Sequence, residues 1–241
     1  MDLKELESGV DPNIHWYYQS KKIPLIQFVK KVYKASNSKL TLVDVGSGSG
    51  FFMYELEKDC SAMIDKIWLV DIGYSDAEMA QTENQKIEKR KDLPLQMKNA
   101  LVVMMDVLEH IEDDVAMLKS IKQNCVGENY FFITVPAFMG LWSGHDVYLG
   151  HYRRYTINTL RQSLSKANWN NTGKKFFYLF GSIFPLVWLI RKLKKNDEVK
   201  SNMAPSSKVV NSLLKALCSA EMHLKYLNSV AGVTCASEGK I

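Results

Sequence analysis

The chain has 241 residues, of which 46% are hydrophobic and 24% are charged, a composition typical of a folded globular protein and not of a disordered or fibrous one. Its net charge of +5 is modest, and the basic residues are spread along the chain, so no nucleic-acid partner is expected. The four cysteines are far apart, at positions 60, 125, 218 and 235, which predicts neither a zinc site nor a disulfide framework and favours a reducing compartment.

The amino-terminal segment is acidic and polar, unlike the basic-then-apolar pattern of a signal peptide, so a cytoplasmic location is expected. Residues 14–33 then carry apolar side chains at near-helical spacing, which predicts an amphipathic helix. We interpret residues 1–38 as a helical cap that packs on the rest of the domain.

Strands and helices alternate after this cap. Short apolar runs at 39–45, 66–70, 100–105 and 130–135 are predicted strands, and the first is followed by a predicted helix at 51–57. This alternation is typical of a parallel sheet covered by helices. Thr156 is predicted to cap a helix that extends to Ala167. Residues 208–228 are predicted to be helical, and residues 230–236 to form one more strand.

A glycine-rich turn follows the first predicted strand. Asp44 ends that strand, and the turn Gly46-Ser47-Gly48-Ser49-Gly50 leads into the helix, which places backbone N–H groups and the positive end of a helix dipole beside a ligand. A dinucleotide fingerprint needs a third glycine where Phe51 or Met53 stands, so a dinucleotide is not expected. Asp71 ends the second strand, where a carboxylate can accept hydrogen bonds from ribose hydroxyls.

Three segments resemble one superfamily. The run Asp44–Gly50 is similar to the acidic-x-Gly-x-Gly-x-Gly motif of class I S-adenosylmethionine-dependent methyltransferases, and Asp106-Val107-Leu108-Glu109-His110 resembles the segment after their fourth strand. Within the superfamily the chain looks most like the type 11/type 23 group. That likeness rests on Val135-Pro136-Ala137, Leu141-Trp142-Ser143, Asp146, Gly150-His151 and Arg153-Arg154-Tyr155, and it spans nearly the whole chain.

The resemblance implies one domain over residues 1–241 with a Rossmann-like α/β fold. The sheet is expected to have seven mostly parallel strands, with the last strand antiparallel and helices on both faces. The implied cofactor is S-adenosyl-L-methionine, with S-adenosyl-L-homocysteine as product and no metal expected. Lys21 stands near the position of an arginine in other members and is a candidate contact for the cofactor's carboxylate. The candidate cofactor-binding residues are Asp44, Gly46, Ser47, Gly48, Gly50, Asp71, Ile72, Asp106, Val107 and Lys21.

Candidate acid/base residues gather in the loop after the 130–135 strand. His145 and His151 are candidate general bases because an unperturbed histidine titrates near ~6.5, and Asp146 is a candidate to orient either of them. Arg153 and Arg154 suit an anionic group of the acceptor. The candidate substrate-binding residues are Tyr148, Arg153, Arg154 and Tyr155. An equally weighted alternative is that Asp146, His151, Arg153 and Arg154 form a structural hydrogen-bonded loop. The favoured interpretation of His110 is a capping or packing histidine, and a catalytic role is the alternative.

Residues 176–190 are uncharged and are followed by Arg191, Lys192, Lys194 and Lys195. The run is shorter than the ~20 residues that a membrane-spanning helix needs. We interpret residues 176–208 as an insertion near the last strands, and residues 176–195 as a candidate for peripheral membrane contact or for a channel that takes an apolar substrate tail. A buried strand followed by a core-packed helix is the alternative.

The leading hypothesis is therefore a methyltransferase for a small or lipid-linked metabolite, with O-methylation of a sugar or cell-envelope intermediate as the favoured reaction and N-methylation left open. The expected location is cytoplasmic, at or near the inner face of a membrane. A protein or RNA methyltransferase, and a non-catalytic scaffold that binds S-adenosylmethionine, are the alternatives.

Overall fold

Seven strands form one sheet in the order β3-β2-β1-β4-β5-β7-β6. The computed structural model describes residues 9–81, 84–169, 173–193, 198–201 and 203–241. Adjacent strands from β3 to β5 are parallel, whereas β7 runs antiparallel to both of its neighbours. The predicted Rossmann-like sheet with an antiparallel last strand is confirmed. The strands are β1 (Leu40–Val45), β2 (Ile64–Val70), β3 (Ile87–Arg90), β4 (Ala100–Met105), β5 (Tyr130–Pro136), β6 (Lys175–Leu179) and β7 (Thr234–Lys240).

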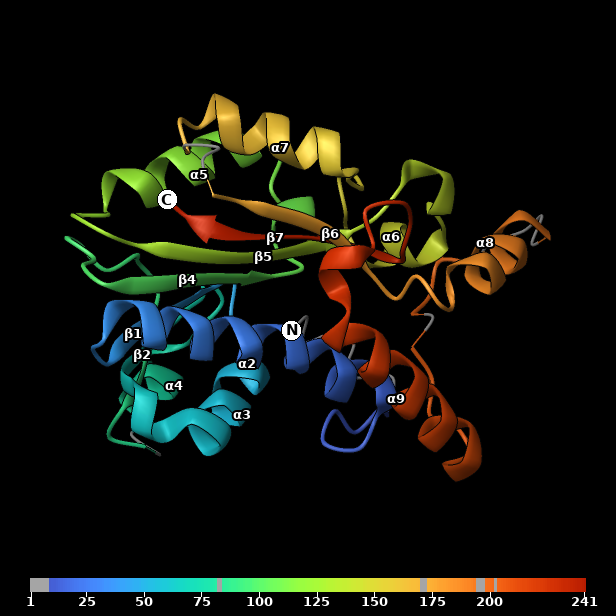
Figure 1. Cartoon of the computed structure of the whole chain (residues 1–241), viewed down its shortest axis with the longest axis horizontal. Coiled ribbons are helices and arrows are strands. Elements are labelled where there is room, and N and C mark those ends of the chain that lie inside the picture. Colours follow the sequence, from blue (N-terminus) through green and yellow to red (C-terminus); the bar gives the residue numbers. More distant parts are fainter. Residues whose placement is uncertain (1–8, 82–83, 170–172, 194–197, 202) are drawn as a thin grey trace.

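Helices cover both faces of this sheet. α2 (Trp16–Ser36), α3 (Phe51–Cys60) and α4 (Asp76–Ala80) lie on one face, and α5 (Asp114–Gln123) and α7 (Ile157–Lys166) lie on the other (Figure 1). α6 (Gly144–Leu149), α8 (Phe184–Leu193) and α9 (Lys208–His223) gather at the edge where β5 ends (Figure 1). Short 3-10 turns occupy Ser61–Met63, Leu108–His110, Met139–Leu141 and Lys225–Leu227.

The apolar core forms two layers, one on each face of the sheet. Every residue of β4 is buried, as expected for a central strand that helices cover on both sides. The predicted cap at Thr156 is confirmed, because its hydroxyl accepts a hydrogen bond from the backbone N–H of Thr159 at 3.2 Å. These layers fix the carboxyl ends of β1, β2, β4 and β5 along one edge.

The last strand differs from its predicted position. It begins at Thr234, four residues after Val230, whose side chain is 82% exposed. The strand also contains Glu238, which is buried and accepts hydrogen bonds from Lys225 at 2.8 Å and Lys31 at 3.3 Å. The Glu238 charge interrupts the run of apolar side chains by which a buried strand is recognised in a sequence. The sequence does not show that lysines from other segments neutralise this charge. The preceding helix α9 ends at His223, five residues before the predicted end.

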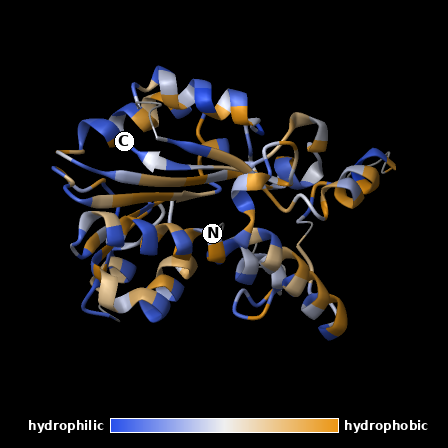
Figure 2. Cartoon of the chain, in the orientation of Figure 1, coloured by the Kyte–Doolittle hydropathy of each residue, from blue (hydrophilic) through white to orange (hydrophobic). Residues whose placement is uncertain are grey.

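The predicted insertion at 176–208 also needs correction at its start, because 176–179 belong to β6. The following helix α8 contains no buried residue, so it is not the core-packed helix of the alternative interpretation. Figure 2 shows hydrophobic residues along this projecting helix.

Lys194 and Lys195 lie outside the described residues, as do residues 1–8 of the predicted cap. Among the described helices, none combines the length and the apolar character needed to cross a membrane.

Candidate functional site

The glycine turn passes close to the end of β4. Gly46 adopts φ +68°, and a Cβ atom there would lie 2.7 Å from a methyl carbon of Val107. Gly50, at φ +72°, caps the amino terminus of α3. Both positions demand glycine because the left-handed backbone and the close approach exclude a side chain. The turn therefore exposes backbone groups and a helix amino terminus to a ligand over β1, which fits the cofactor implied by the motif.

Asp71 braces this turn from the end of β2. Its Oδ2 accepts a hydrogen bond from the backbone N–H of Gly48 at 2.8 Å, and its Oδ1 accepts one from Gly73 at 2.9 Å. A carboxylate has about four acceptor positions, so the two remaining positions suit ribose hydroxyls. Ser47 bonds to the Tyr74 hydroxyl at 2.8 Å. Ile72, beside Asp71, is 91% exposed, which leaves its side chain able to cover a ligand.

Asp44 and Asp106 end the two central strands in different environments. Asp44 is 3% exposed, and burial raises its pKa to about 7. Asp106 has φ +58°; its carboxylate pairs with the ammonium of Lys21 and accepts a hydrogen bond from the Thr134 hydroxyl at 3.0 Å. Lys21 also donates to the Tyr17 hydroxyl at 2.8 Å. The charge predicted to contact the cofactor's carboxylate is thus already paired with Asp106.

A cavity of about 390 Å³ lies beyond Asp106, at the carboxyl ends of β4 and β5. One wall comes from α2 and includes Tyr17 and Lys21, and the opposite wall comes from Ile183, Val187 and Ile190 in and before α8. Most of the surface lining it is apolar. The cavity lies at the edge where parallel α/β sheets bind ligands, next to the cofactor turn.

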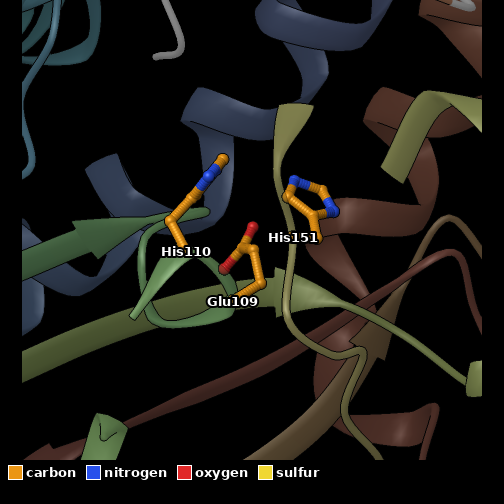
Figure 3. Close-up of side chains that lie close together, drawn as sticks. All are labelled: Glu109, His110 and His151. Carbon is orange, nitrogen blue, oxygen red and sulfur yellow. The ribbon is translucent and has the colours of Figure 1, made fainter. Parts of the chain in front are cut away.

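The polar wall of the cavity carries Glu109, His110 and His151. The ligand-forming atoms of these three side chains all lie within 4.8 Å of one another, and the two imidazole rings meet edge to face at 4.6 Å between centroids. In Figure 3 the Glu109 carboxylate lies below the two rings and close to both. Glu109 is fully buried, and neither of its oxygens has a hydrogen-bond partner among the described residues. Burial, together with the nearby Asp106 carboxylate, raises the pKa of Glu109 well above its usual range.

Asp146 organises the loop around His151. Its carboxylate accepts from His151 Nδ1 at 2.9 Å and from Arg154 Nε and Nη2 at 2.7 and 3.0 Å. Burial raises the pKa of Asp146, but these hydrogen bonds outweigh it and hold that pKa below its usual value. Arg154 Nη1 donates to the Ala137 carbonyl at 3.1 Å. The guanidinium is therefore committed to the fold, as in the structural-loop interpretation, and has no free fork for an anionic acceptor.

The other predicted substrate-binding residues lie away from the cavity. Tyr155 is 2% exposed, and its hydroxyl bonds to Asp114 at 2.8 Å and to the Leu108 carbonyl at 3.2 Å. Arg153 pairs with Asp114 at 3.3 Å, and Tyr148 is half-buried on α6. Arg153 and Tyr155 do not line this cavity, and Asp114 engages both of them. Their role in acceptor binding stays a prediction.

His145 and the apolar wall complete the cavity. His145 lines it, and burial lowers the pKa of this imidazole to about 4, which leaves the side chain neutral near pH 7. Phe180, Ile183 and Val187 belong to the run predicted as a channel for an apolar substrate tail or as a membrane contact, and they line the cavity. Glu109 was not predicted as a site residue. The one sequence signal for Glu109 was its place in the Asp106–His110 segment.

Comparisons with known proteins agree with this geometry. Residues 16–173 match the family model Methyltransf_23, described as a methyltransferase domain. The plantazolicin methyltransferase BpumL, in a crystal structure with a triazolic desmethylPZN analog and SAH, has 12% identity and a TM-score of 0.55, covering 91% of this chain and 84% of that chain. BamL, also with a triazolic analog and SAH, has 10% identity and a TM-score of 0.52, with 91% and 84% covered. No curated protein sequence matches the chain.

The two structural likenesses show the fold, and the family match covers more than half of the chain. The glycine turn, the strand-end acids and the neighbouring cavity form the expected site for S-adenosyl-L-methionine in this fold. The chain therefore belongs to the methyltransferase-domain family and is an S-adenosylmethionine-dependent enzyme of class I.

Proposed function

We propose that this enzyme methylates an oxygen atom of a small or lipid-linked acceptor, such as a sugar or cell-envelope intermediate. The observation that carries the proposal is the apolar wall of the cavity, formed by Phe180, Ile183, Val187 and Ile190. Burial of apolar surface is worth roughly 25 cal/mol per Å², so this wall favours an acceptor with an apolar tail over a wholly polar one.

S-adenosylmethionine supplies an electrophilic methyl group, and the side chains mainly align the acceptor and receive its proton. Alignment of the acceptor with the methyl group can lower a barrier by about 7–11 kcal/mol, and a general base contributes roughly 10²–10⁴-fold. His145 is unprotonated near pH 7, but burial lowers its pKa to about 4, so it is a candidate base of low basicity. His151, whose Nδ1 is held by Asp146, is the second candidate base.

The exposed face of α8 supports access from a membrane surface. Leu186, Leu189 and Leu193 are 59%, 47% and 71% exposed, and Arg191 and Lys192 lie in the same helix. An exposed apolar helix with basic residues suits the interface of an anionic membrane. Since Ile190 of this helix also lines the cavity, a lipid-linked acceptor would enter beside the membrane contact, at the inner face of a membrane.

The test offers methyl-labelled S-adenosylmethionine together with four separate cell fractions: lipids, polar metabolites, RNA and proteins. The proposal predicts label in the lipid or polar-metabolite fraction. Label in RNA or protein alone would support the alternative methyltransferase classes, and binding of S-adenosylhomocysteine without labelling of any fraction would support a non-catalytic scaffold. Gly46→Ala serves as the cofactor-site variant, and Gly140→Ala is the matched control because a Cβ at Gly140 meets no atom within 4 Å.

A further inference from the structure

The cluster of Glu109, His110 and His151 has the composition of a cation site. Two imidazoles and one carboxylate present ligand atoms within 4.8 Å of one another, and all three residues line the cavity. Divalent transition metals favour such a mixed nitrogen and oxygen donor set, and three protein ligands leave a position open for another molecule.

The two cations near Glu109 each form an ion pair with another carboxylate. Lys21 is paired with Asp106, and Arg154 is paired with Asp146. Glu109 is fully buried, and its two oxygens have no hydrogen-bond partner among the described residues. A buried ionised carboxylate is costly unless it is paired or binds a metal, so this side chain calls for a positive partner at the point where both histidines converge.

His151 is held in the orientation that a metal ligand needs. Its Nδ1 lies 2.9 Å from Asp146 Oδ1; because a carboxylate only accepts, the proton lies on Nδ1 and the lone pair lies on Nε2. A carboxylate that fixes the tautomer and ring orientation of a ligating histidine is a recurrent support of metal sites. The Arg154 fork, in turn, holds Asp146 in place.

We propose that Glu109, His110 and His151 bind one divalent transition-metal ion, such as Zn²⁺, at the polar wall of the acceptor cavity. The ion neutralises Glu109 and presents its open position to the cavity, where it orients an acceptor oxygen. That role, unlike the binding itself, rests on the proposed oxygen methylation. With His151 engaged as a ligand, His145 is the remaining candidate to receive the acceptor's proton.

Titration of the metal-free protein with Co²⁺, followed by visible absorption, tests the site without any acceptor. The expected result is one Co²⁺ per chain with saturable visible bands. Glu109→Gln keeps the size of the side chain and removes the anionic ligand, so affinity should fall by at least the roughly 10–100-fold that loss of a supporting contact to a ligand costs. His110→Ala should also lose the bands. His145→Ala is the matched control, since it removes a histidine of the same cavity outside the cluster and should leave the bands unchanged.

Stability separates loss of the site from loss of the fold. Glu109→Gln should melt no lower than the metal-free wild type, because the Glu109 side chain makes no hydrogen bond among the described residues that the substitution could remove. Zn²⁺ should raise the midpoint of the wild type alone. A wild type without saturable bands, or a Glu109→Gln variant that keeps them, would overturn the proposal. Because the titration needs no acceptor, its failure is distinct from failure of the proposed methylation, which the labelled-fraction test decides.

Discussion

The cofactor half and the acceptor half of the site are built in different ways. The cofactor half, residues 44–50 with Asp71, uses a short turn and two neighbouring strand ends, and its key contacts are backbone N–H groups. The acceptor half, the cavity between Asp106 and α8, brings together side chains from α2, the Asp106–His110 segment, the α6 loop and α8. Cofactor recognition therefore depends on local backbone shape, whereas acceptor recognition depends on tertiary packing.

The largest expected effect is a loss of stability when the loop of the acceptor half loses Asp146. Asp146→Ala leaves the Arg154 guanidinium buried without its partner, and loss of one member of a buried ion pair costs about 3–5 kcal/mol. We expect a loss of that size in the free energy of unfolding measured by urea denaturation. Asp65→Ala, at an exposed position, should change it by less than about 0.5 kcal/mol. An Asp146→Ala variant as stable as wild type would show that this loop is not held as described.

Gly46→Ala breaks the cofactor half. The added Cβ would lie 2.7 Å from Val107 in a backbone with φ +68°, and such strain and overpacking cost about 2–4 kcal/mol. Calorimetry should therefore show S-adenosylhomocysteine binding weakened by about 30- to 1,000-fold. Gly140→Ala should bind like wild type, and equal affinity in the Gly46→Ala variant would contradict the position of the turn.

The buried carboxyl group of Asp44 makes the stability of the cofactor half depend on pH. Burial raises its folded-state pKa to about 7, above the ~3.9 of an unfolded aspartate, so its contribution to stability is fully present below about pH 4 and is lost as the pH rises through 7. Asp44→Asn should remove this slope and stabilise the cofactor-free protein at pH 8 by on the order of 2 kcal/mol. The measurement is urea unfolding at pH 5, 7 and 8, and an unchanged slope in the variant would refute the assignment.

The smallest effect concerns the outer wall of the acceptor half. Leu193→Asp in α8, at a position 71% exposed, should weaken flotation with anionic vesicles by about 1 kcal/mol, a several-fold change. The control Leu95→Asp alters a leucine that is 79% exposed away from α8. Equal losses for the two variants would indicate nonspecific binding and not a membrane face on α8.

The same comparison explains what the sequence can predict. The Asp44–Gly50 turn was predictable because its strand, glycines and helix are contiguous, so local backbone rules apply. The Lys21–Asp106 pair joins residues 85 positions apart, and no periodicity reports that contact. Arg154 looked suited to an anionic acceptor because a sequence does not show that Asp146 already occupies both prongs of its fork. The role of Glu109 could not be predicted, because its burial depends on packing by segments that are distant in the sequence.

A crystal structure with S-adenosylhomocysteine bound would show how the cofactor turn and the cavity face each other. We expect its ribose hydroxyls to contact Asp71 and its backbone contacts to come from the Gly46–Gly50 turn. We expect its sulfur to face the cavity lined by Glu109, His145 and Ile183. A ligand whose sulfur faces away from this cavity, or one bound without contact to Asp71 and the glycine turn, would contradict this arrangement.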